Sequence, residues 1–287
     1  MSTVVLLTLT GLGLAALYFL IASGLSLVFG LAGVLNFAHG LFLSVGAYAG
    51  WFVARHWALG AAIPVGVAAG AATGALVELV VIRPLYRRPT EQVLATVGLS
   101  LAGVALLQSI WGADPRSYPR PAWTAHTTGV LGAQVPDDRF LLIGAAVLVL
   151  AALLAFLRWT RYGLIIRAGV ENRAMVSALG IDVRAAFTLV FTLGGALAGA
   201  AGVLGGMYFG SVSPGQGAGL LIFAFIVVVI GGLGSITGSA VAAVVVGVLQ
   251  QFVNYYGTSG AGDVSVVALL AVVLLLRPAG LAGKVAA

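Results

Sequence analysis

Residues 4–28 read VVLLTLTGLGLAALYFLIASGLSLV, an apolar stretch without one charged side chain. The hydrocarbon core of a bilayer is roughly 30 Å thick and needs about 20 helical residues to cross it, so this stretch is long enough to span a membrane. The charge-free region extends further, because residues 1–54 and residues 185–262 contain no Asp, Glu, Lys or Arg. No basic segment precedes the first apolar run, so we expect a retained membrane helix rather than a cleaved signal peptide.

The composition of the whole chain supports the same class of protein. Of its 287 residues, 61% are hydrophobic and only 8% are charged, whereas about 25% of the residues of a soluble domain are charged. So few polar side chains cannot cover a globule in water, which excludes a soluble enzyme and a disordered chain. The absence of Cys also excludes a disulfide scaffold and thiol catalysis.

The predicted fold is an all-α, polytopic transmembrane helical bundle with about eight to ten spans and broken helices, forming a single domain over residues 1–287. Helices are favoured over a β-barrel because the apolar runs are continuous and do not alternate with polar residues. The predicted spans are residues 4–28, 38–54, 61–82, 92–112, 140–157, 186–208, 219–233, 236–256 and 261–276. The segments 219–233 and 261–276 are short for a full crossing.

The positions of the cations predict the orientation. Of fourteen Lys and Arg residues, segment 83–91 holds three, segment 158–184 holds five and the tail after residue 276 holds two. Nine alternating spans place these segments on one side, which the positive-inside rule assigns to the cytoplasm. The N-terminus is then outside and the C-terminus inside. Loop 113–139 is external, and we interpret it as a connector with interfacial aromatic residues; the alternative is a structured lid or docking surface.

Glycines recur at helical spacing in two of the predicted spans. Gly66, Gly70 and Gly74 are four residues apart, and Gly195, Gly199, Gly202 and Gly206 share one helix face. Small faces let helix backbones approach closely in lipid. We interpret both faces as packing surfaces within the subunit; a sliding face or the wall of a narrow path is the alternative.

Ionisable residues are almost absent from the predicted spans, although proton and ion coupling normally requires them. Glu78 lies near a span end, where we expect it to reach the interface or pair with a neighbouring cation. The only lysine, Lys284, is not in a P-loop, so this chain does not bind ATP through that motif. We therefore predict no cofactor, no metal site and no catalytic residue in the chain, and an external source of energy for any transport.

A polar break interrupts the apolar sequence at residues 30–40. Asn36 is predicted to cap a helix that begins at Phe37, and a helix start within the membrane suits a carboxylate or another polar group. The alternative is a tight hairpin in which Asn36 and His39 bond to neighbouring backbone. A second Gly-rich break, residues 231–238, separates two later spans.

Residues 168–179 are predicted to form a short amphipathic helix. The segment mixes Glu171 and Arg173 with apolar residues, contains no Gly after residue 169, and stops at Gly180, a typical helix end. It is too polar to span the membrane. It either contacts a partner or lies on the membrane surface.

Several motifs in the correct order resemble the permease subunits of branched-chain amino acid ABC transporters of the LivH type. They are Asn36-Phe-Ala-His-Gly40, Gly46-Ala-Tyr48, Glu78 with Arg83-Pro-Leu85, Ala95-Thr-Val-Gly-Leu99, Arg161-Tyr-Gly163 with Arg167-Ala168, Ala178-Leu-Gly-Ile-Asp182, Gly231-Gly-Leu-Gly-Ser-Ile-Thr-Gly238 and Arg277-Pro-Ala-Gly-Leu281. This resemblance covers essentially the whole chain. It implies a single transmembrane permease domain in the bacterial inner membrane. It also implies four kinds of partner: a second homologous permease, two cytoplasmic ATPase subunits that carry ATP and Mg, an external solute-binding protein and the lipid bilayer.

The resemblance and the breaks together predict two groups of functional residues. The substrate path or its hinge is assigned to Asn36, His39, Gly40, Gly232, Gly234 and Ser235. ATPase coupling through loop 158–184 is assigned to Arg167, Ala168, Glu171, Arg173, Ala174, Met175, Ala178, Leu179, Gly180, Ile181 and Asp182. The general coupling-loop pattern of ABC permeases places an acidic residue elsewhere, so Glu171 departs from it.

The predicted function is import of a branched-chain amino acid or a related small amino acid or amide, driven by partner ATPases. The alternative from another class is a stand-alone channel or facilitator for a small polar solute such as urea. An intramembrane enzyme around His39 is a remote third hypothesis. The residues do not identify the solute, nor whether the second permease is a paralogue or another copy of this chain.

Overall fold

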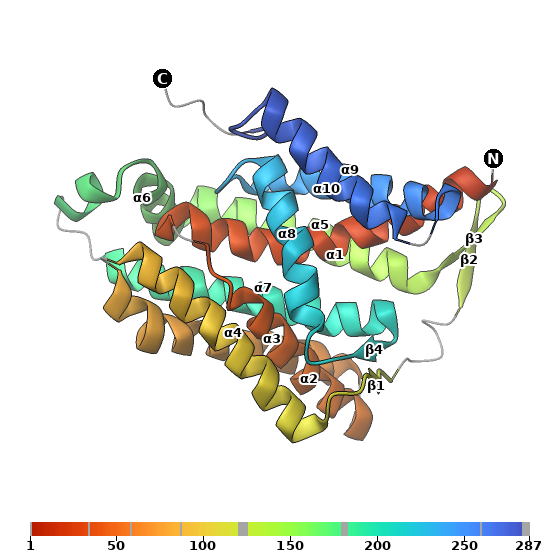
Figure 1. Cartoon of the computed structure of the whole chain (residues 1–287), viewed down its shortest axis with the longest axis horizontal. Helices are drawn as coiled ribbons and strands as arrows, with labels where there is room; N and C mark the ends of the chain where they lie inside the picture. Colours follow the sequence, from red (N-terminus) through yellow and green to blue (C-terminus); the bar gives the residue numbers. More distant parts are fainter. Residues whose placement is uncertain are drawn as a thin grey trace.

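The computed structural model describes residues 2–33, 35–57, 59–86, 88–119, 126–178, 183–258 and 260–282. For residues 59, 170–175, 177–178 and 183 it describes the backbone alone. Within these ranges the chain is an all-α bundle with four short strands (Figure 1).

The first half of the chain holds four apolar helices joined by short connectors. They are α1 (Ser2–Ala32), α2 (His39–His56), α3 (Leu59–Val77) and α4 (Pro89–Trp111). Between α3 and α4 the chain makes a π-helical turn η1 (Glu78–Ile82) and a 3-10 turn η2 (Arg83–Leu85).

The second half begins with strands and continues with six helices. The strands are β1 (Arg116–Ser117), β2 (Thr127–Val130), β3 (Ala133–Pro136) and, later, β4 (Ser211–Val212). The helices are α5 (Asp137–Trp159), α6 (Arg161–Ala178), α7 (Val183–Phe209), α8 (Gln216–Gly231), α9 (Ile236–Tyr256) and α10 (Ala261–Leu276).

Each predicted span coincides with an apolar helix, which confirms the fold class. Six helical segments of the described chain are long and apolar enough to cross a membrane. The helices α8 and α10 contain 16 residues each, as the short segments 219–233 and 261–276 indicated. The helix α2 contains 18 residues, and six residues separate it from the end of α1. A bundle of this kind satisfies its backbone polar groups inside its own helices, as lipid requires.

The two glycine faces pack against each other. A Cβ atom at Gly70 would lie 2.2 Å from the carbonyl oxygen of Gly195, and one at Gly199 would lie 2.2 Å from that of Gly66. Further along α7, a Cβ at Gly202 would meet the backbone of α2. The prediction of packing within the subunit is confirmed, and α2, α3 and α7 form one closely packed unit.

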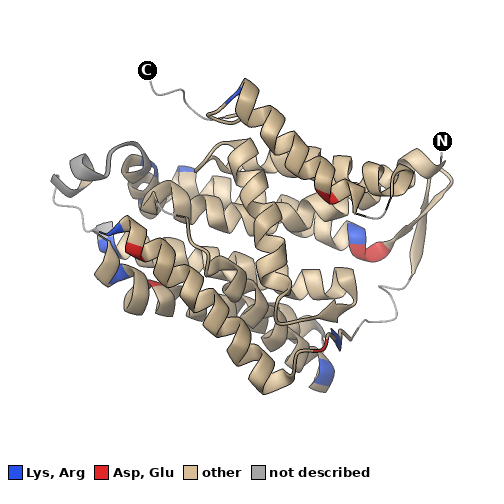
Figure 2. Ribbon diagram, viewed as in Figure 1, with Lys and Arg blue, Asp and Glu red and all other residues tan. Residues whose placement is uncertain are grey.

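Charged residues lie toward the two ends of the long axis, and the middle of the bundle is nearly free of them (Figure 2). The helix α6 lies at one end and the β2–β3 hairpin at the opposite end (Figure 1). This separation is the pattern of a protein whose central layer lies in hydrocarbon.

The described part of loop 113–139 contains short paired strands. Strand β1 pairs with β4, and β2 pairs with β3 in a hairpin. Tyr118 is only 3% exposed and its ring lies against Gly206, while the indole of Trp51 donates to the carbonyl of Ser117 at 2.9 Å. Burial raises the pKa of Tyr118, so the phenol stays neutral. Small residues on α2 and α7 leave the space that this loop fills.

Candidate substrate path

Two short helices begin inside the bundle rather than at its ends. The helix α8 is about 24 Å long at 1.5 Å per residue, which is less than the roughly 30 Å of a hydrocarbon core. In Figure 1 it runs across α1 in the middle of the molecule. The first residues of α2, His39 and Gly40, are buried, and so is Gly217 in the first turn of α8.

The N-terminal turns of α2 and α8 cross in direct backbone contact. A Cβ at Gly40 would lie 2.7 Å from the carbonyl oxygen of Gly217, and a Cβ at Gly217 would lie 2.0 Å from that of Gly40. Ser44 joins the two helices, because its hydroxyl donates to the Pro214 carbonyl at 3.1 Å and accepts from the Gly217 amide at 3.2 Å. Glycine is required at both positions of this crossing because no side chain fits between the backbones.

Asn36 shapes the entry into α2, although not as the predicted cap. The helix starts at His39, not at Phe37, and no side chain caps it. Instead, the Asn36 side-chain oxygen accepts from the amide of Ala38 at 3.0 Å. This contact spans two residues and is typical of the turn that Asn forms with its own backbone. The amide nitrogen of the Asn36 side chain has no hydrogen-bond partner among the described residues.

His39 is fully buried at the same turn. Its Nε2 atom lies 3.2 Å from the carbonyl oxygen of Ile21 on α1, and its ring packs edge-on against Phe42. The Nδ1 atom has no partner within the described part of the chain. A Cβ at Gly24 would touch both the His39 ring and the backbone of Gly194 on α7. His39 therefore lies where α1, α2 and α7 meet.

An apolar groove of about 140 Å³ opens beside the crossing. Phe37 forms one wall, α4 contributes Leu101, and α8 contributes Ala218, Ile222 and Phe225. The rings of Phe37 and Phe225 are 5.2 Å apart. The groove thus places an apolar surface next to the two helix N-termini, whose dipoles favour negative charge.

Gly232, Gly234 and Ser235 lie away from this crossing. They form the turn between α8 and α9, with φ of +99° at Gly232 and +81° at Gly234. Ser235 caps α9 by accepting from the amide of Gly238 at 3.1 Å. A Cβ at Gly234 would contact Gly30 at 3.1 Å, so the two Gly-rich breaks meet in space. This placement makes them a capped turn at the far end of α8, and not part of its N-terminal crossing.

The helix predicted over residues 168–179 belongs to α6, which is longer than predicted. It starts at Arg161 instead of residue 168, because the Thr160 hydroxyl accepts from the amide of Gly163 at 2.9 Å and caps the helix. Arg167 is exposed and Ala168 is partly buried. The side chains of Glu171, Arg173, Ala174, Met175 and Ala178 lie outside the described residues, as do Leu179, Gly180, Ile181 and Asp182 entirely.

Gly217, Ser44 and Pro214 are the residues of the crossing that sequence reasoning missed. The signal was the dense turn sequence Ser213-Pro-Gly-Gln-Gly217 ahead of a span already noted as short. That sequence marks a second break before a helix with a buried residue, Gly217, in its first turn, comparable to the break at Asn36.

A helical bundle in which two helices begin at buried positions fits the class of multi-pass membrane permeases. The family model described as "Branched-chain amino acid transport system / permease component" matches residues 7–276. The chain belongs to this family, and the resemblance noted in its motifs is confirmed.

Individual relatives agree over nearly the full chain. It is 30% identical to the high-affinity branched-chain amino acid transport system permease protein LivH of Escherichia coli, over 96% of this chain and 94% of the relative. It is 31% identical to BraD of Pseudomonas aeruginosa, with the same two coverages. The permease protein LivM of Escherichia coli is 26% identical over 93% of this chain and 68% of the relative. No solved structure matches the chain.

Proposed function

We propose that the chain is the transmembrane permease subunit of an ATP-driven ABC importer for branched-chain or related small amino acids. The observation that carries this proposal is the family match over residues 7–276. The relatives LivH and BraD are named as branched-chain amino acid permeases, and they are similar to this chain from end to end.

The crossing of α2 and α8 supports an amino acid as the solute. Two helix N-termini meet there, and they favour a carboxylate. The neighbouring groove between Phe37, Leu101 and Ile222 is apolar, as an aliphatic side chain needs.

The energy and the partners are assigned by the same proposal. The helices of the crossing carry no Asp, Glu or Lys, which supports an external energy source over proton coupling. Two cytoplasmic ATPases supply ATP hydrolysis, a LivM-like paralogue is the second permease, and an external binding protein delivers the solute. The membrane is the bacterial inner membrane, with the N-terminus outside and the C-terminus in the cytoplasm.

Coupling through α6 and the residues after it is tested by reversing one charge. Arg173→Glu in the complete transporter is expected to reduce uptake of labelled leucine at least about tenfold. The substitution places a negative charge where a positive one is proposed to meet the ATPase, and like charges at a protein interface cost several kcal/mol. A cost of about 1.4 kcal/mol already corresponds to a tenfold change. Gly180→Pro is expected to act in the same direction by changing the end of the coupling segment.

Arg173→Lys serves as the matched control, because it keeps the charge. ATPase activity stimulated by the binding protein is measured beside uptake. Wild-type uptake and stimulation in both Arg173→Glu and Gly180→Pro would show that this segment does not contact the ATPases.

A further inference from the structure

Glu78 is a buried carboxylate that the substrate path does not use. It is the first residue of the π-helical turn η1 and is 0% exposed, so the expectation that it reaches the interface is wrong. Thr188, in the second turn of α7, donates to its Oε2 atom at 2.7 Å, and the Tyr86 hydroxyl donates to Oε1. Glu78 therefore joins the connection between α3 and α4 to the beginning of α7.

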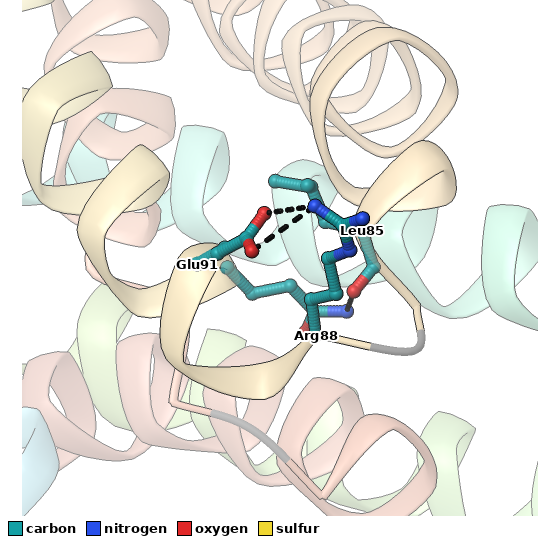
Figure 3. A network of polar contacts seen from close by, with 4 residues as sticks. Leu85, Arg88 and Glu91 are labelled. Atoms are coloured by element: carbon teal, nitrogen blue, oxygen red, sulfur yellow. Dashed lines mark hydrogen bonds and ion pairs between the residues drawn. The ribbon is translucent and has the colours of Figure 1, made fainter.

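The connection between α3 and α4, together with the first turn of α4, contains internal hydrogen bonds. We call this segment the elbow (residues 78–86 and 88–92). The Arg88 guanidinium lies 3.1 Å from both carboxylate oxygens of Glu91, and the Arg88 amide donates to Leu85 (Figure 3). The Gln92 side chain also donates to the Leu85 carbonyl at 2.7 Å. Both Arg88 and Gln92 therefore bond to the Leu85 carbonyl, which links the end of η2 to the first turn of α4.

The start of α7 contacts both the elbow and the end of α3. The rings of Tyr86 and Phe187 are 4.6 Å apart, and a Cβ at Gly74 would lie 2.4 Å from the carbonyl oxygen of Phe191. Thr188 therefore sits in a closely packed contact between two parts of the chain far apart in sequence. Movement of the first turns of α7 must move the elbow with them.

The helix α7 leads from this contact to the crossing. Its first residue, Val183, follows the coupling loop, and Gly199 lies about 16 Å further along the helix than Thr188. At that level α7 packs on α3 and on α2, since a Cβ at Gly199 would meet Gly66 and a Cβ at Gly46 would meet Gly199. The unit of α2, α3 and α7 thus connects the coupling loop to the half-helix that follows Asn36.

We propose that the hydrogen bond between Thr188 and Glu78 is the joint through which movement of the cytoplasmic loop turns α2, α3 and α7 as one body. Glu78 and Thr188 are positioning residues for transport and do not contact the solute. This inference rests on the proposed function, because it assigns a route to the ATPase coupling. A π-helical turn at the joint fits this role, since such turns are rare and occur frequently at functional sites.

The role of the Thr188 hydroxyl can be tested by two substitutions of similar size. Thr188→Val keeps the shape of the side chain and removes the hydroxyl, so that one oxygen of a buried carboxylate loses its donor. Thr188→Ser keeps the hydroxyl. Thr192 is the matched control, because it lies one turn further along the same helix and its hydroxyl donates to a backbone group of that helix, the carbonyl of Thr188, at 2.6 Å.

The quantity to measure is leucine taken up per ATP hydrolysed by the complete transporter in liposomes. Thr188→Val is expected to lower this ratio at least about fivefold, because a buried acceptor is left without its hydrogen-bond donor. Thr188→Ser and Thr192→Val are expected to keep the wild-type ratio. A wild-type ratio in Thr188→Val overturns the inference, and so does a proportional fall of uptake and ATPase activity that leaves the ratio unchanged.

Three outcomes separate a failure of the inference from a failure of the proposed function. If Thr188→Val does not assemble with its partners, Tyr86→Phe removes the other donor to Glu78; a lowered ratio in that variant then supports the inference, and a wild-type ratio overturns it. If the wild-type complex takes up leucine without ATP hydrolysis, the proposed function itself fails, and with it the inference. If the wild type and Thr188→Val take up the same amount of leucine per ATP hydrolysed, the inference about the Thr188–Glu78 bond fails while the proposed function stands.

Discussion

Gly217→Ala is expected to reduce uptake by the complete transporter at least about tenfold. The new methyl group would lie 2.0 Å from the carbonyl oxygen of Gly40 and 2.5 Å from the Ser44 hydroxyl, so the N-terminal turns of α2 and α8 must separate. Overpacking of this kind costs about 1–3 kcal/mol, and about 1.4 kcal/mol is a tenfold change in the population of the competent arrangement.

A control for this substitution lies on the same helix two residues away. A Cβ at Gly219 meets nothing within 4 Å, so Gly219→Ala changes helix propensity and side-chain size without touching the crossing. Its uptake is expected to stay within about twofold of the wild type, since an exposed substitution typically costs no more than about 0.5 kcal/mol. Equal uptake by Gly217→Ala and Gly219→Ala would show that the crossing does not form part of the path.

Gly70→Val is expected to destabilise the folded protein by about 2–3 kcal/mol or more, measured as a lower thermal unfolding midpoint in lipid nanodiscs. A Cβ at this position would lie 2.2 Å from the carbonyl oxygen of Gly195 and 2.8 Å from the Cα of Gly199. Both neighbours are backbone atoms of α7, which cannot turn away as a side chain can. The helices α3 and α7 must therefore move apart along their whole contact.

Two glycines on other helices provide the comparison. A Cβ at Gly98 on α4 or at Gly144 on α5 has nothing within 4 Å. Alanine at these positions is expected to raise stability by a few tenths to about 1 kcal/mol, as for compatible Gly→Ala changes elsewhere. A melting temperature of Gly70→Val equal to that of Gly98→Ala would contradict the packed unit of α2, α3 and α7.

The helices of this protein could be predicted from the sequence because charge and apolarity are local properties. Residues 4–28 and the other long apolar runs have no alternative in a bilayer, and each forms a helix. The break at Asn36 was also local, since Asn and Gly mark it directly. The predicted helix start was wrong by two residues because Asn36 turns the chain through its own backbone instead of capping the helix.

The contacts between helices could not be predicted in the same way. Gly40 and Gly217 are ordinary small residues until the fold brings them together, and nothing near either one identifies its partner. Glu78 was misplaced for the same reason: its donor Thr188 is 110 residues away in the chain. The break at residues 231–238 was predicted correctly. Its place at the far end of α8, away from the crossing with α2, could not be predicted because it depends on where α8 starts.

The most direct test of the proposed function is accumulation of labelled leucine in liposomes, with and without ATP. One set of liposomes contains this chain with its second permease, the two ATPases and the binding protein, and the other contains this chain alone. We predict accumulation against a gradient only in the complete set and only with hydrolysable ATP. Equilibration of leucine or urea through the chain alone, independent of ATP, would contradict ATP-driven import and would identify a facilitator.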